Sequence, residues 1–471
     1  MTRKIILFTP RSEWAHEKIK KEDNLQTIPG RQNLKEIASA VFQAAVRAVA
    51  PETCVRRHLR LSENRLKAGE TEYSLDQIDR LYLVGAGKAS AAMARAVEEV
   101  LEDRITDGVI LTKYGHAVEL KHCKVIEAGH PVPDENGVRG THALLDLVSN
   151  AGPEDLILCL VSGGGSALSP APAEGIRLAD KQKTTRLLLK CGATIHEINT
   201  LRKHLSQIKG GRLCTAANGA RIVSLILSDV VGDDLDIIAS GMTAPDPSRF
   251  EDCFDILSKY SLTGKIPDTV HEHLTTGRDG QTAETPKPED SVFERVQNRI
   301  VGSLSDALAA AEAEARRKGY PPLLLSSMIQ GEAKEVAKVL CGIAREVQRS
   351  GKPTPAPVCL LSGGETTVTV KGDGLGGRNM ELALAAGLSL AGTSGILLLS
   401  AGTDGNDGPT DAAGAFADGS TISRAAASGR SASEYLARND SYHFFEPLED
   451  LFITGPTRTN VMDLQVLLVD G

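Results

Sequence analysis

The sequence is poor in aromatic residues, carries no excess of basic residues and contains no C-x-x-C pair. Phe, Trp and Tyr make up only 4% of the 471 residues, which does not suit a protein that binds single-stranded nucleic acid by aromatic stacking. Asp and Glu (61) outnumber Lys and Arg (53), giving a formal net charge of −8. Because binding to phosphate backbones needs a basic surface, we expect no nucleic-acid partner.

The sequence also shows no pattern typical of disulfides, of a secretory signal or of membrane spans. The eight cysteines are widely spaced, and several lie inside apolar runs such as Leu158-Cys159-Leu160. They are typical of small buried side chains in a reducing compartment. The uncharged stretches 156–173 and 382–403 are interrupted by glycine turns, whereas a membrane helix needs about 20 consecutive apolar residues. We therefore expect a cytoplasmic protein with no membrane partner.

Glycine, in contrast, is abundant, with 45 residues, and often follows a short apolar run. Wholly apolar strands that alternate with amphipathic helices indicate parallel sheets covered on both faces. Because single cores stop growing near about 250–300 residues, two domains are expected. We predict an α/β fold with two domains of mainly parallel sheets flanked by helices, and an active site in the cleft between them. The predicted parts are an N-terminal arm (1–32), a Rossmann-like domain (33–290) and a C-terminal domain (291–471).

The sequence predicts where two of the helices begin. It does not predict which sheet the last strand joins. Asn33 is a plausible cap for an amphipathic helix, with Glu36 three residues later. Asp134 is expected to begin a helix that ends near Ser149. The apolar strand 464–469 at the C-terminus could join either sheet.

The turn Gly85-Ala-Gly87-Lys88 follows a predicted strand and opens a predicted helix. Glycines at this place let backbone N–H groups approach an anion, and Lys88 would add a full positive charge. The turn is not a Walker A loop, because Ala89 follows the lysine. It nearly matches the dinucleotide pattern G-x-G-x-x-G, with Ser90 at the third glycine position. A tight turn with an exposed lysine is the simpler explanation.

Two further glycine turns follow strands. Gly372–Gly377 matches G-x-G-x-x-G outright and is followed by Arg378 and Asn379, of which the arginine can pair bidentately with phosphate or carboxylate. The other turn ends a wholly apolar strand, at a position where α/β sheets place ligands. It consists of Ser162, Gly163, Gly164, Gly165 and Ser166. No G-x-S-x-G frame surrounds Ser166, which argues against a nucleophilic serine.

Basic and acidic side chains add candidates. Helical spacing places Asn199, Arg202, Ser206 and Lys209 near one helix face, which is either a solvated basic face or one that binds an anion. Asp229 follows another apolar strand and should lie at the carboxyl edge of the sheet. The acid cluster at Asp404 fails the EF-hand spacing. It is consistent with Mg²⁺ held together with phosphate oxygens, or with an Asx-rich turn.

These motifs together resemble the class II glycerate kinases, whose C-terminal part is called the MOFRL domain. The resemblance covers about residues 34–470. The matching stretches are V-G-A-G-K-A-S (84–90), G-H-P-V-P-D (129–134), L-V-S-G-G-G-S-A-L (160–168), N-T-L-R-K-H-L-S-Q-I-K-G-G (199–211), L-S-D-V-V-G-D (227–233), G-G-R-N (376–379), S-A-G-T-D-G-N-D-G-P-T-D-A-A-G (400–414) and T-N-V-M-D-L (459–464).

The resemblance implies transfer of the γ-phosphoryl group of ATP to D-glycerate, with Mg²⁺, usually to give 2-phosphoglycerate. Two active-site residues of the family map onto Lys88 and Arg378. The sequence departs from the family's usual residues at four positions, which bear on substrate preference more than on reaction type. They are Met242, Leu304, Met380 and Arg458, the last in place of a usual glycine.

The residues leave three functions open. In a glycerate kinase, Lys88 would contact the transferred phosphate, Arg378 the developing charge or the substrate carboxylate, Asp229 the substrate hydroxyl and Asp404 the metal. An NAD(P)-dependent hydroxypyruvate reductase would use the glycine turns for the dinucleotide, with Lys113 conceivably contacting a 2′-phosphate, but no ribose-binding acid follows the second strand. A non-catalytic sugar-acid or nucleotide-binding regulator would have the same composition. The oligomeric state does not follow from the sequence.

Overall fold

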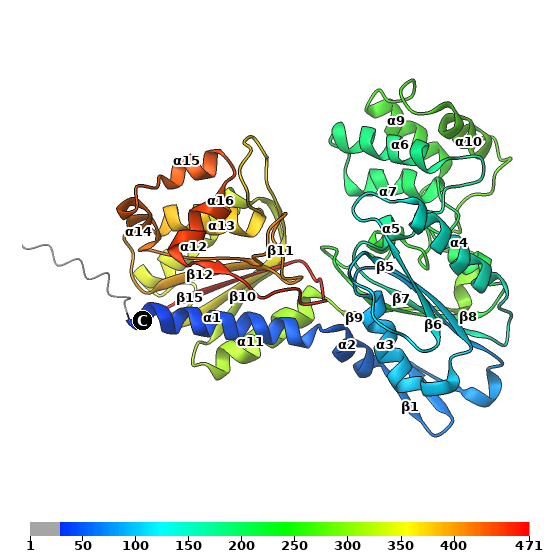
Figure 1. Cartoon of the computed structure of the whole chain (residues 1–471), viewed down its shortest axis with the longest axis horizontal. Coiled ribbons are helices and arrows are strands. Elements are labelled where there is room, and N and C mark those ends of the chain that lie inside the picture. The colour runs from blue at the N-terminus through cyan, green and yellow to red at the C-terminus, as the bar shows by residue number, and fades with distance from the viewer. Residues whose placement is uncertain (1–28, 471) are drawn as a thin grey trace, which may run out of the picture.

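The computed structural model describes residues 29–470, which form two lobes side by side (Figure 1). The lobes are linked by helices α1 (Pro29–Ala48) and α2 (Pro51–His58), and again where the first sheet leads into helix α11 (Leu304–Arg317). No helix in this described part of the chain is long and apolar enough to cross a membrane.

The first lobe is built on a six-stranded sheet in which all neighbouring strands are parallel. Counted along the sheet, its order is third, second, first, fourth, fifth, sixth, as in doubly wound dinucleotide-binding folds. The order reverses between β4 and β7, which opens a crevice at their carboxyl ends. The strands are β4 (Leu81–Ala86), β5 (Asp107–Lys113), β6 (Cys123–Ala128), β7 (Leu156–Val161), β8 (Arg221–Leu227) and β9 (Val296–Gly302).

Helices cover both faces of this sheet, which is why strands β4 and β7 are apolar and buried at every position. Asp134 caps one of the covering helices by accepting a hydrogen bond from the Gly137 N–H at 2.9 Å, so the predicted start is confirmed. The helices on this sheet are α2, α3 (Ser90–Leu101), α4 (Glu135–Ser149), α5 (Gly165–Leu168) and α8 (Arg212–Ala216), and a three-stranded meander, β1 (Leu59–Ser62), β2 (Arg65–Ala68) and β3 (Thr71–Ser74), lies beside them.

A separate helical layer lies above the carboxyl edge of the first sheet (Figure 1). It has its own apolar core. Thr194 and Glu197 form a capping box at the start of its second helix. The layer consists of α6 (Leu178–Lys190), α7 (Ile195–His204), α9 (Phe250–Lys259) and α10 (Asp268–Arg278).

The second lobe has a mixed sheet, in which only β10 and β11 are parallel neighbours. The C-terminal strand β15 lies between β11 and β12 and is antiparallel to both, so it joins the second sheet. The order is β10 (Pro322–Glu332), β11 (Val358–Thr367), β15 (Asp463–Val469), β12 (Ile396–Gly402), β13 (Gly414–Asp418) and β14 (Leu451–Phe452). The expectation of mainly parallel pairing is therefore confirmed for the first sheet and wrong for the second.

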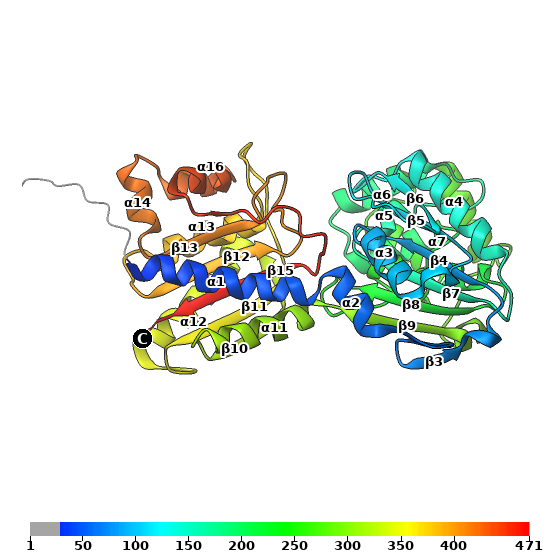
Figure 2. The same cartoon turned by 60° about the horizontal axis from the view of Figure 1, so that its bottom comes forward.

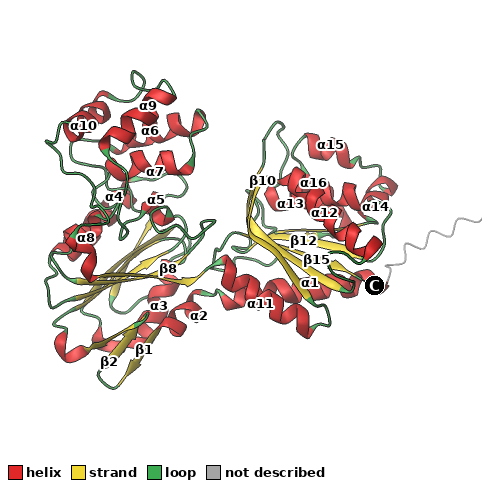
Figure 3. Ribbon diagram, turned by 180° about the vertical axis from the view of Figure 1, so that it is seen from behind, coloured by secondary structure: helices red, strands yellow, loops and turns green. Residues whose placement is uncertain are grey.

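Helices also cover both faces of the second sheet (Figure 3). One face carries α12 (Ala333–Ser350) and α13 (Arg378–Leu390), which share an apolar core with β11, β12 and β15. The other face carries α1 and α11. The short helices α14 (Thr421–Ala427), α15 (Ala432–Ala437) and α16 (Ser441–Phe445) complete this lobe.

The predicted domain boundaries differ from the observed lobes at two points. Strand β9 lies after residue 290 but pairs with β8 in the first sheet. Helix α1 begins at Pro29, before the predicted cap Asn33, and lies along the second sheet (Figure 2). Phe42 of α1 packs edge-on against Phe452, with ring centroids 5.1 Å apart. Helical periodicity shows that α1 buries one face but cannot show against which sheet. Residues 1–28 of the predicted arm lie outside the described residues.

Candidate active site

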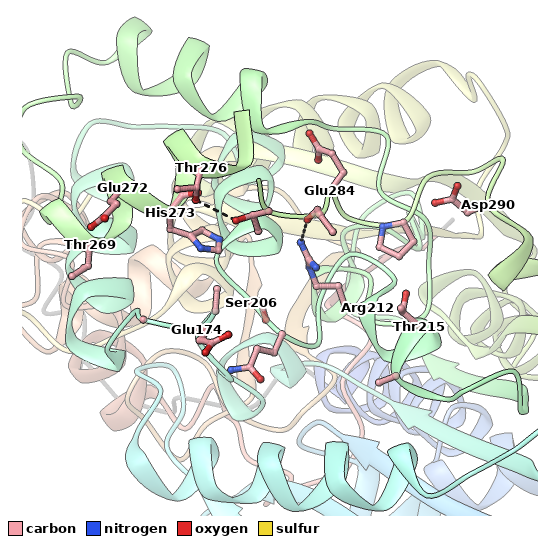
Figure 4. Close-up of a pocket in the computed structure, with 17 residues that line it drawn as sticks. Glu174, Ser206, Arg212, Thr215, Thr269, Glu272, His273, Thr276, Glu284 and Asp290 are labelled. Carbon is pink, nitrogen blue, oxygen red and sulfur yellow. Dashed lines mark hydrogen bonds between the residues drawn. The ribbon is translucent and has the colours of Figure 1, made fainter. Parts of the chain in front are cut away.

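Two large cavities lie on the described part of the chain. One, of about 910 Å³, lies in the first lobe among helices α8 and α10 and the loop around Glu284 (Figure 4). Of the candidate residues named from the sequence, only Ser206 lines it. The other, of about 940 Å³, lies between the lobes and is lined by Lys88, Asp229, Arg378 and Asp404. Since the second cavity also lies at the switch point of the doubly wound sheet, it is the candidate active site.

The turn between β4 and α3 is held tightly against the end of β7. The Lys88 N–H donates to the Gly163 carbonyl at 2.8 Å, and the Ala89 N–H donates to Ser162 Oγ at 3.0 Å. Gly87 has φ +151°, and a Cβ there would lie 2.1 Å from Ser162 Oγ. Gly85 similarly faces Leu160, where a Cβ would lie 2.6 Å from the carbonyl oxygen. Only glycine fits these approaches, so the turn fixes Lys88 at the cleft.

The second turn, after β7, presents backbone donors to the same cleft. Within residues 29–470, the N–H groups of Gly163 and Gly164 donate to no protein acceptor, although the N–H of Gly165 bonds to the Ser162 carbonyl. Gly164 has φ +82°, a conformation that glycine adopts without strain. The hydroxyl of Ser162 is already hydrogen bonded to the helix α3 turn. An anion at this turn would therefore be bound by the backbone N–H groups and not by the Ser162 hydroxyl.

Asp229 lies directly beneath this turn. Its carboxylate is so close that a Cβ on Gly163 would lie 2.2 Å from Oδ2. Burial raises the pKa of Asp229 to about 6, Lys88 acts in the opposite direction, and Glu365 and Asp404 raise the pKa further. A carboxylate with a pKa just below neutrality is well matched to accept a proton.

The second lobe contributes Arg378, the first residue of helix α13. Its guanidinium donates to both oxygens of Asp463, at 2.6 and 3.0 Å, and to Glu365 at 2.6 Å. These three bonds use three of its five N–H groups. Burial raises the pKa of Asp463 to about 6, although Arg378 lowers it. Arg378 is therefore held rigidly at the cleft with two donors left for a ligand.

The G-x-G-x-x-G turn before Arg378 is filled by the protein itself. Added Cβ atoms on Gly372 and Gly374 would lie 2.3 and 2.6 Å from the Arg438 carbonyl oxygen. At the start of α13, the carboxylate of Asp407 accepts from the backbone N–H groups of Asn379 and Met380, at 3.1 and 2.7 Å. The glycines thus serve close packing within the second lobe, and an aspartate occupies the helix N-terminus where a phosphate would bind.

Asn379 is not exposed to the cleft. Its side chain accepts a hydrogen bond from Ser400 Oγ at 2.7 Å and contacts Asp407 at 3.4 Å. Asn379 therefore helps to fix the first turn of α13 in place. Burial raises the pKa of Asp407 to about 7, against the lowering effect of its two backbone hydrogen bonds.

An ion pair crosses the cleft. Lys88 Nζ of the first lobe lies 3.8 Å from Asp404 Oδ2 of the second, and both side chains are partly exposed. Asp404 also accepts the Asn406 N–H at 3.1 Å. The residues predicted to bind phosphate and metal therefore face each other across the cleft.

Three predicted residues lie deeper in the first lobe. Lys209 is fully buried and donates to the carbonyls of Ser166 and Ser169, both at 2.9 Å. Its ammonium group is held by these carbonyls instead of facing the cleft. Helix α7 ends at His204, so the prediction that Ser206 and Lys209 share a helix face with Asn199 and Arg202 is wrong. Ser166 and Arg202 line a smaller pocket that opens beside the cleft.

The cleft also contains residues that the sequence analysis did not select. They are His116, His130, Glu365, Asn460 and Asp463. Lys113, which the sequence suggested only as a contact for a 2′-phosphate, also lines the cleft. Burial and the neighbouring Lys88 and Lys113 lower the pKa of His130 to about 4, so this histidine is neutral at pH 7. His130 lies in the stretch G-H-P-V-P-D (129–134), which matches the family, so this resemblance could have identified it as a site residue.

The four departures from the family's usual residues fall into two groups. Met242, Leu304 and Met380 are buried core residues. Arg458 alone lines the cleft, and it has a left-handed backbone with φ +63°. That conformation accounts for glycine being the usual residue there.

The arrangement places the chain in the class of two-lobed α/β proteins whose ligand site lies at the switch point of a doubly wound sheet. Two family profiles match the chain: "Domain of unknown function (DUF4147)" over residues 37–275 and "MOFRL family" over residues 358–463. Together with the relatives described next, these matches show that the chain belongs to the class II glycerate kinase family.

The relatives are similar over nearly the whole chain. "D-glycerate 2-kinase" of Thermotoga maritima is 42% identical over 439 residues, which are 93% of this chain and 99% of that protein. A "Putative hydroxypyruvate reductase" of Agrobacterium vitis is 44% identical over 392 residues, 83% of this chain and 99% of that protein. A crystal structure of glycerate kinase from Thermotoga maritima superposes with a TM-score of 0.82 at 41% identity, covering 93% of this chain and 100% of that one.

Proposed function

We propose that this enzyme transfers the γ-phosphoryl group of ATP to D-glycerate, at the 2-hydroxyl, to give 2-phosphoglycerate and ADP. The observation that carries the proposal is the meeting of Lys88, Arg378 and Asp229 around one cleft, with unpaired backbone N–H groups between them. Phosphoryl transfer needs positioning and charge stabilisation rather than covalent chemistry, and these groups provide both. The names of the relatives support the same reaction.

Charge stabilisation falls to the groups at the first glycine turns. Lys88 contacts the transferred phosphoryl group, and the N–H groups of Gly163 and Gly164 bind its oxygens. Arg378 uses its two remaining donors on the charge that develops in the transition state. Because Asp463 and Glu365 hold Arg378 in place, no reorganisation is needed when the charge appears.

Proton removal falls to Asp229. It lies beneath Gly163 and has a pKa of about 6, so it is mostly ionised at pH 7. An ionised carboxylate beside the glycine turn orients the substrate hydroxyl and accepts its proton as the phosphoryl group arrives.

The donor set fits a magnesium ion bound together with nucleotide. Mg²⁺ in such sites takes one or two carboxylates and otherwise water and phosphate oxygens. Asp404 supplies such a carboxylate beside Lys88, and no group of three or more His, Cys, Asp or Glu with metal-binding geometry occurs in residues 29–470. When bound, the ion neutralises charge on the phosphates. Asp404 is the residue that would hold it.

The reductase function is the alternative, because the Agrobacterium vitis relative carries that name. It would need a dinucleotide at a glycine turn, but the outright G-x-G-x-x-G match is filled by residues 438–441 and Asp407. Strand β5 ends in Lys113, without an acid for the ribose.

A coupled ADP-release assay with ATP, Mg²⁺ and D-glycerate tests the proposal, with NADH or NADPH and hydroxypyruvate run in parallel. We expect glycerate-dependent ADP release, and 2-phosphoglycerate as the product by NMR. Oxidation of reduced nicotinamide without ADP release would replace the kinase with the reductase. Formation of 3-phosphoglycerate would retain the kinase and change the assigned hydroxyl.

A further inference from the structure

A pocket of about 430 Å³ lies beside the cleft, lined mainly by the first lobe and also by Gln330 and Glu365 of the second. Gly164, Asp229 and Glu365 line both cavities, so the two adjoin at these residues. Its inner wall is formed by helix α7 and the segments around Ser166 and Ile237. A ligand that spans the junction at Gly164 would place one end in this side pocket and the other at Lys88.

The wall of the side pocket carries an arginine with no acidic partner. Arg202 is largely buried, yet within residues 29–470 it forms no ion pair. Its only protein hydrogen bond is a long one, from Nη1 to Asn199 Oδ1 at 3.4 Å. None of its nitrogen atoms is buried without a partner, so the remaining donors reach the space of the pocket. Burial lowers the pKa of Arg202. Such a guanidinium is stabilised by an anion in front of it.

Two buried lysines lie close to Arg202. Lys209 donates to the carbonyls of Ser166 and Ser169, and Lys181 donates to the Pro170 carbonyl at 2.7 Å. Neither forms an ion pair within the described residues. Arg202 lowers the pKa of each lysine, which shows that the three groups lie close enough to repel one another. Burial is the larger cause and brings the pKa of Lys181 to about 7.

Acidic side chains do line the pocket, but at its edges. Asp229 and Glu365 lie at the junction with the cleft, and Asp234 is exposed. None of the three pairs with Arg202 within 4.0 Å among the described residues. The positive inner wall and the acidic rim therefore divide the pocket into an anion end and a proton-accepting end.

A hydrogen-bond network fixes the inner wall. Ser240 Oγ donates to Asn199 Oδ1 at 3.1 Å and lies 2.8 Å from Ser166 Oγ. Ala239 and Ser240 are consecutive non-glycine residues with φ values of +50° and +57°. Such backbone conformations persist only where the surroundings hold them, and they cluster at ligand sites.

We propose that Arg202 binds the carboxylate of the acceptor acid, so that the side pocket selects 2-hydroxy acids over uncharged alcohols. This assignment rests on the proposed function for the reaction, and it replaces Arg378 as the carboxylate ligand. With the carboxylate at Arg202, the carbon bearing the 2-hydroxyl lies at the junction beside Gly164 and Asp229. The 2-hydroxyl then faces the base and the phosphoryl group bound at Lys88.

Kinetics of Arg202→Gln test the assignment, with D-glycerate and its uncharged amide, glyceramide, as acceptors. Losing a charge-assisted bidentate contact should raise the KM for D-glycerate by about 100-fold. The KM for ATP should change little, and the preference for D-glycerate over glyceramide should fall by about the same 100-fold. An unchanged preference between the two acceptors would overturn the proposal, because a merely structural role affects both alike. Arg202→Lys, with partial recovery of the preference expected, serves if the Gln variant does not fold.

Arg212→Gln is the matched control. Arg212 is also a largely buried arginine without an ion pair in the described chain, but it lines the other cavity of the first lobe (Figure 4). It donates to the Ala283 carbonyl at 3.0 Å. We expect Arg212→Gln to leave the preference for D-glycerate unchanged. A loss of preference equal to that of Arg202→Gln would attribute the effect to general destabilisation and overturn the assignment.

A binding measurement separates this inference from the proposed function. If wild-type protein releases no ADP with D-glycerate, the proposed kinase fails, and D-glycerate and D-lactate are then titrated calorimetrically into both proteins without ATP. Binding to the wild type that is lost in Arg202→Gln supports the carboxylate site. Equal binding by both proteins, or no binding by the wild type, overturns it.

Discussion

Both lobes carry glycine-rich turns after strands, and the turns of the two lobes serve different purposes. The turn at Gly85–Lys88 places Lys88 at the cleft, and the turn at Ser162–Ser166 leaves the Gly163 and Gly164 N–H groups there without an acceptor among residues 29–470. The turn at Gly372–Gly377 is the better match to a dinucleotide motif, but Arg438, Asp440 and Asp407 occupy the space around it. The glycines of both lobes allow close packing of the chain, but only the turns of the first lobe present a lysine and open backbone donors to the cleft.

The difference shows that a glycine pattern indicates where another group packs closely against the backbone, but not whether that group is a ligand or part of the chain. The first sheet is wholly parallel, so β4 and β7 end together at a switch point, where Lys88, Gly163 and Gly164 line the cleft. The second sheet is mainly antiparallel, and the turn before α13 is closed by the segment 438–441. The environment, not the motif, decides which turn binds a ligand.

The largest expected effect comes from removing the charge at the open turn. Lys88→Ala should lower kcat by about 10²–10⁴, as loss of a preorganised charge in an active site typically does. Steady-state ADP release measures it. The melting temperature should hardly change, because the ion pair of Lys88 with Asp404 is partly exposed and 3.8 Å long. Wild-type turnover in this variant would remove Lys88 from the mechanism.

Removing the base beside the open turn should cost about 10²-fold in kcat/KM. In the wild type, kcat/KM should rise with pH through about 6, because Asp229 must lose its proton before it can accept one from the substrate. Asp229→Asn should abolish this rise as well as lowering the rate. A variant that keeps the same acidic limb would show that another group is the base.

Alanine at corresponding glycines compares the two turns directly. Gly374→Ala should lower the free energy of unfolding by about 1–3 kcal/mol, since its Cβ would lie 2.4 Å from the Asp440 Cβ. Its kcat/KM per folded molecule should be unchanged. Gly87→Ala should lose activity by about 10²-fold, because displacement of Lys88 and Ser162 disturbs the site itself. Urea denaturation and kinetics on the same samples separate the two effects, and equal loss of activity in both variants would contradict the comparison.

The filled turn also predicts a pH dependence of stability. Burial raises the pKa of Asp407 from its ordinary value of 3.8 to about 7, so the folded protein holds this proton more tightly than the unfolded chain. The stabilisation by protonated Asp407 is present at low pH and is lost as the pH rises from about 4 to 7. Asp407→Asn should make the fall in unfolding free energy over this range shallower than in the wild type. Parallel slopes in the two proteins would show that Asp407 does not titrate there.

The smallest expected effect concerns the rim of the cleft. Arg458 has φ +63°, so Arg458→Gly should raise the free energy of unfolding by less than about 1 kcal/mol, as relief of backbone strain is partly offset by the entropy of glycine in the unfolded chain. Arg458→Ala removes the same charge but keeps a Cβ, and it should not stabilise. Equal melting temperatures for the two variants would mean that strain at this position is negligible.

The sequence predicted much of the fold because the signals were local. Apolar strands, the Asp134 cap and the glycine turns predicted the parallel sheet of the first lobe, and they placed Lys88 and Asp229 at its carboxyl edge. Long, specific motifs identified the family. What local signals could not provide was the partner of each apolar face, so α1 and β9 were assigned to the wrong lobes.

Which residues carry charge and where strands turn could be predicted, since both depend on residue type and on neighbours along the chain. Which charged and polar groups remain free for a ligand became clear only in the folded protein. Lys209 is occupied by backbone carbonyls, Asn379 by Ser400 and Asp407, and most of Arg378 by two carboxylates. Within residues 29–470, Arg202 has no carboxylate or backbone carbonyl partner and only a long hydrogen bond to the Asn199 amide oxygen. Whether a buried charge is neutralised depends on groups brought together from distant parts of the chain, and no spacing along the sequence records that.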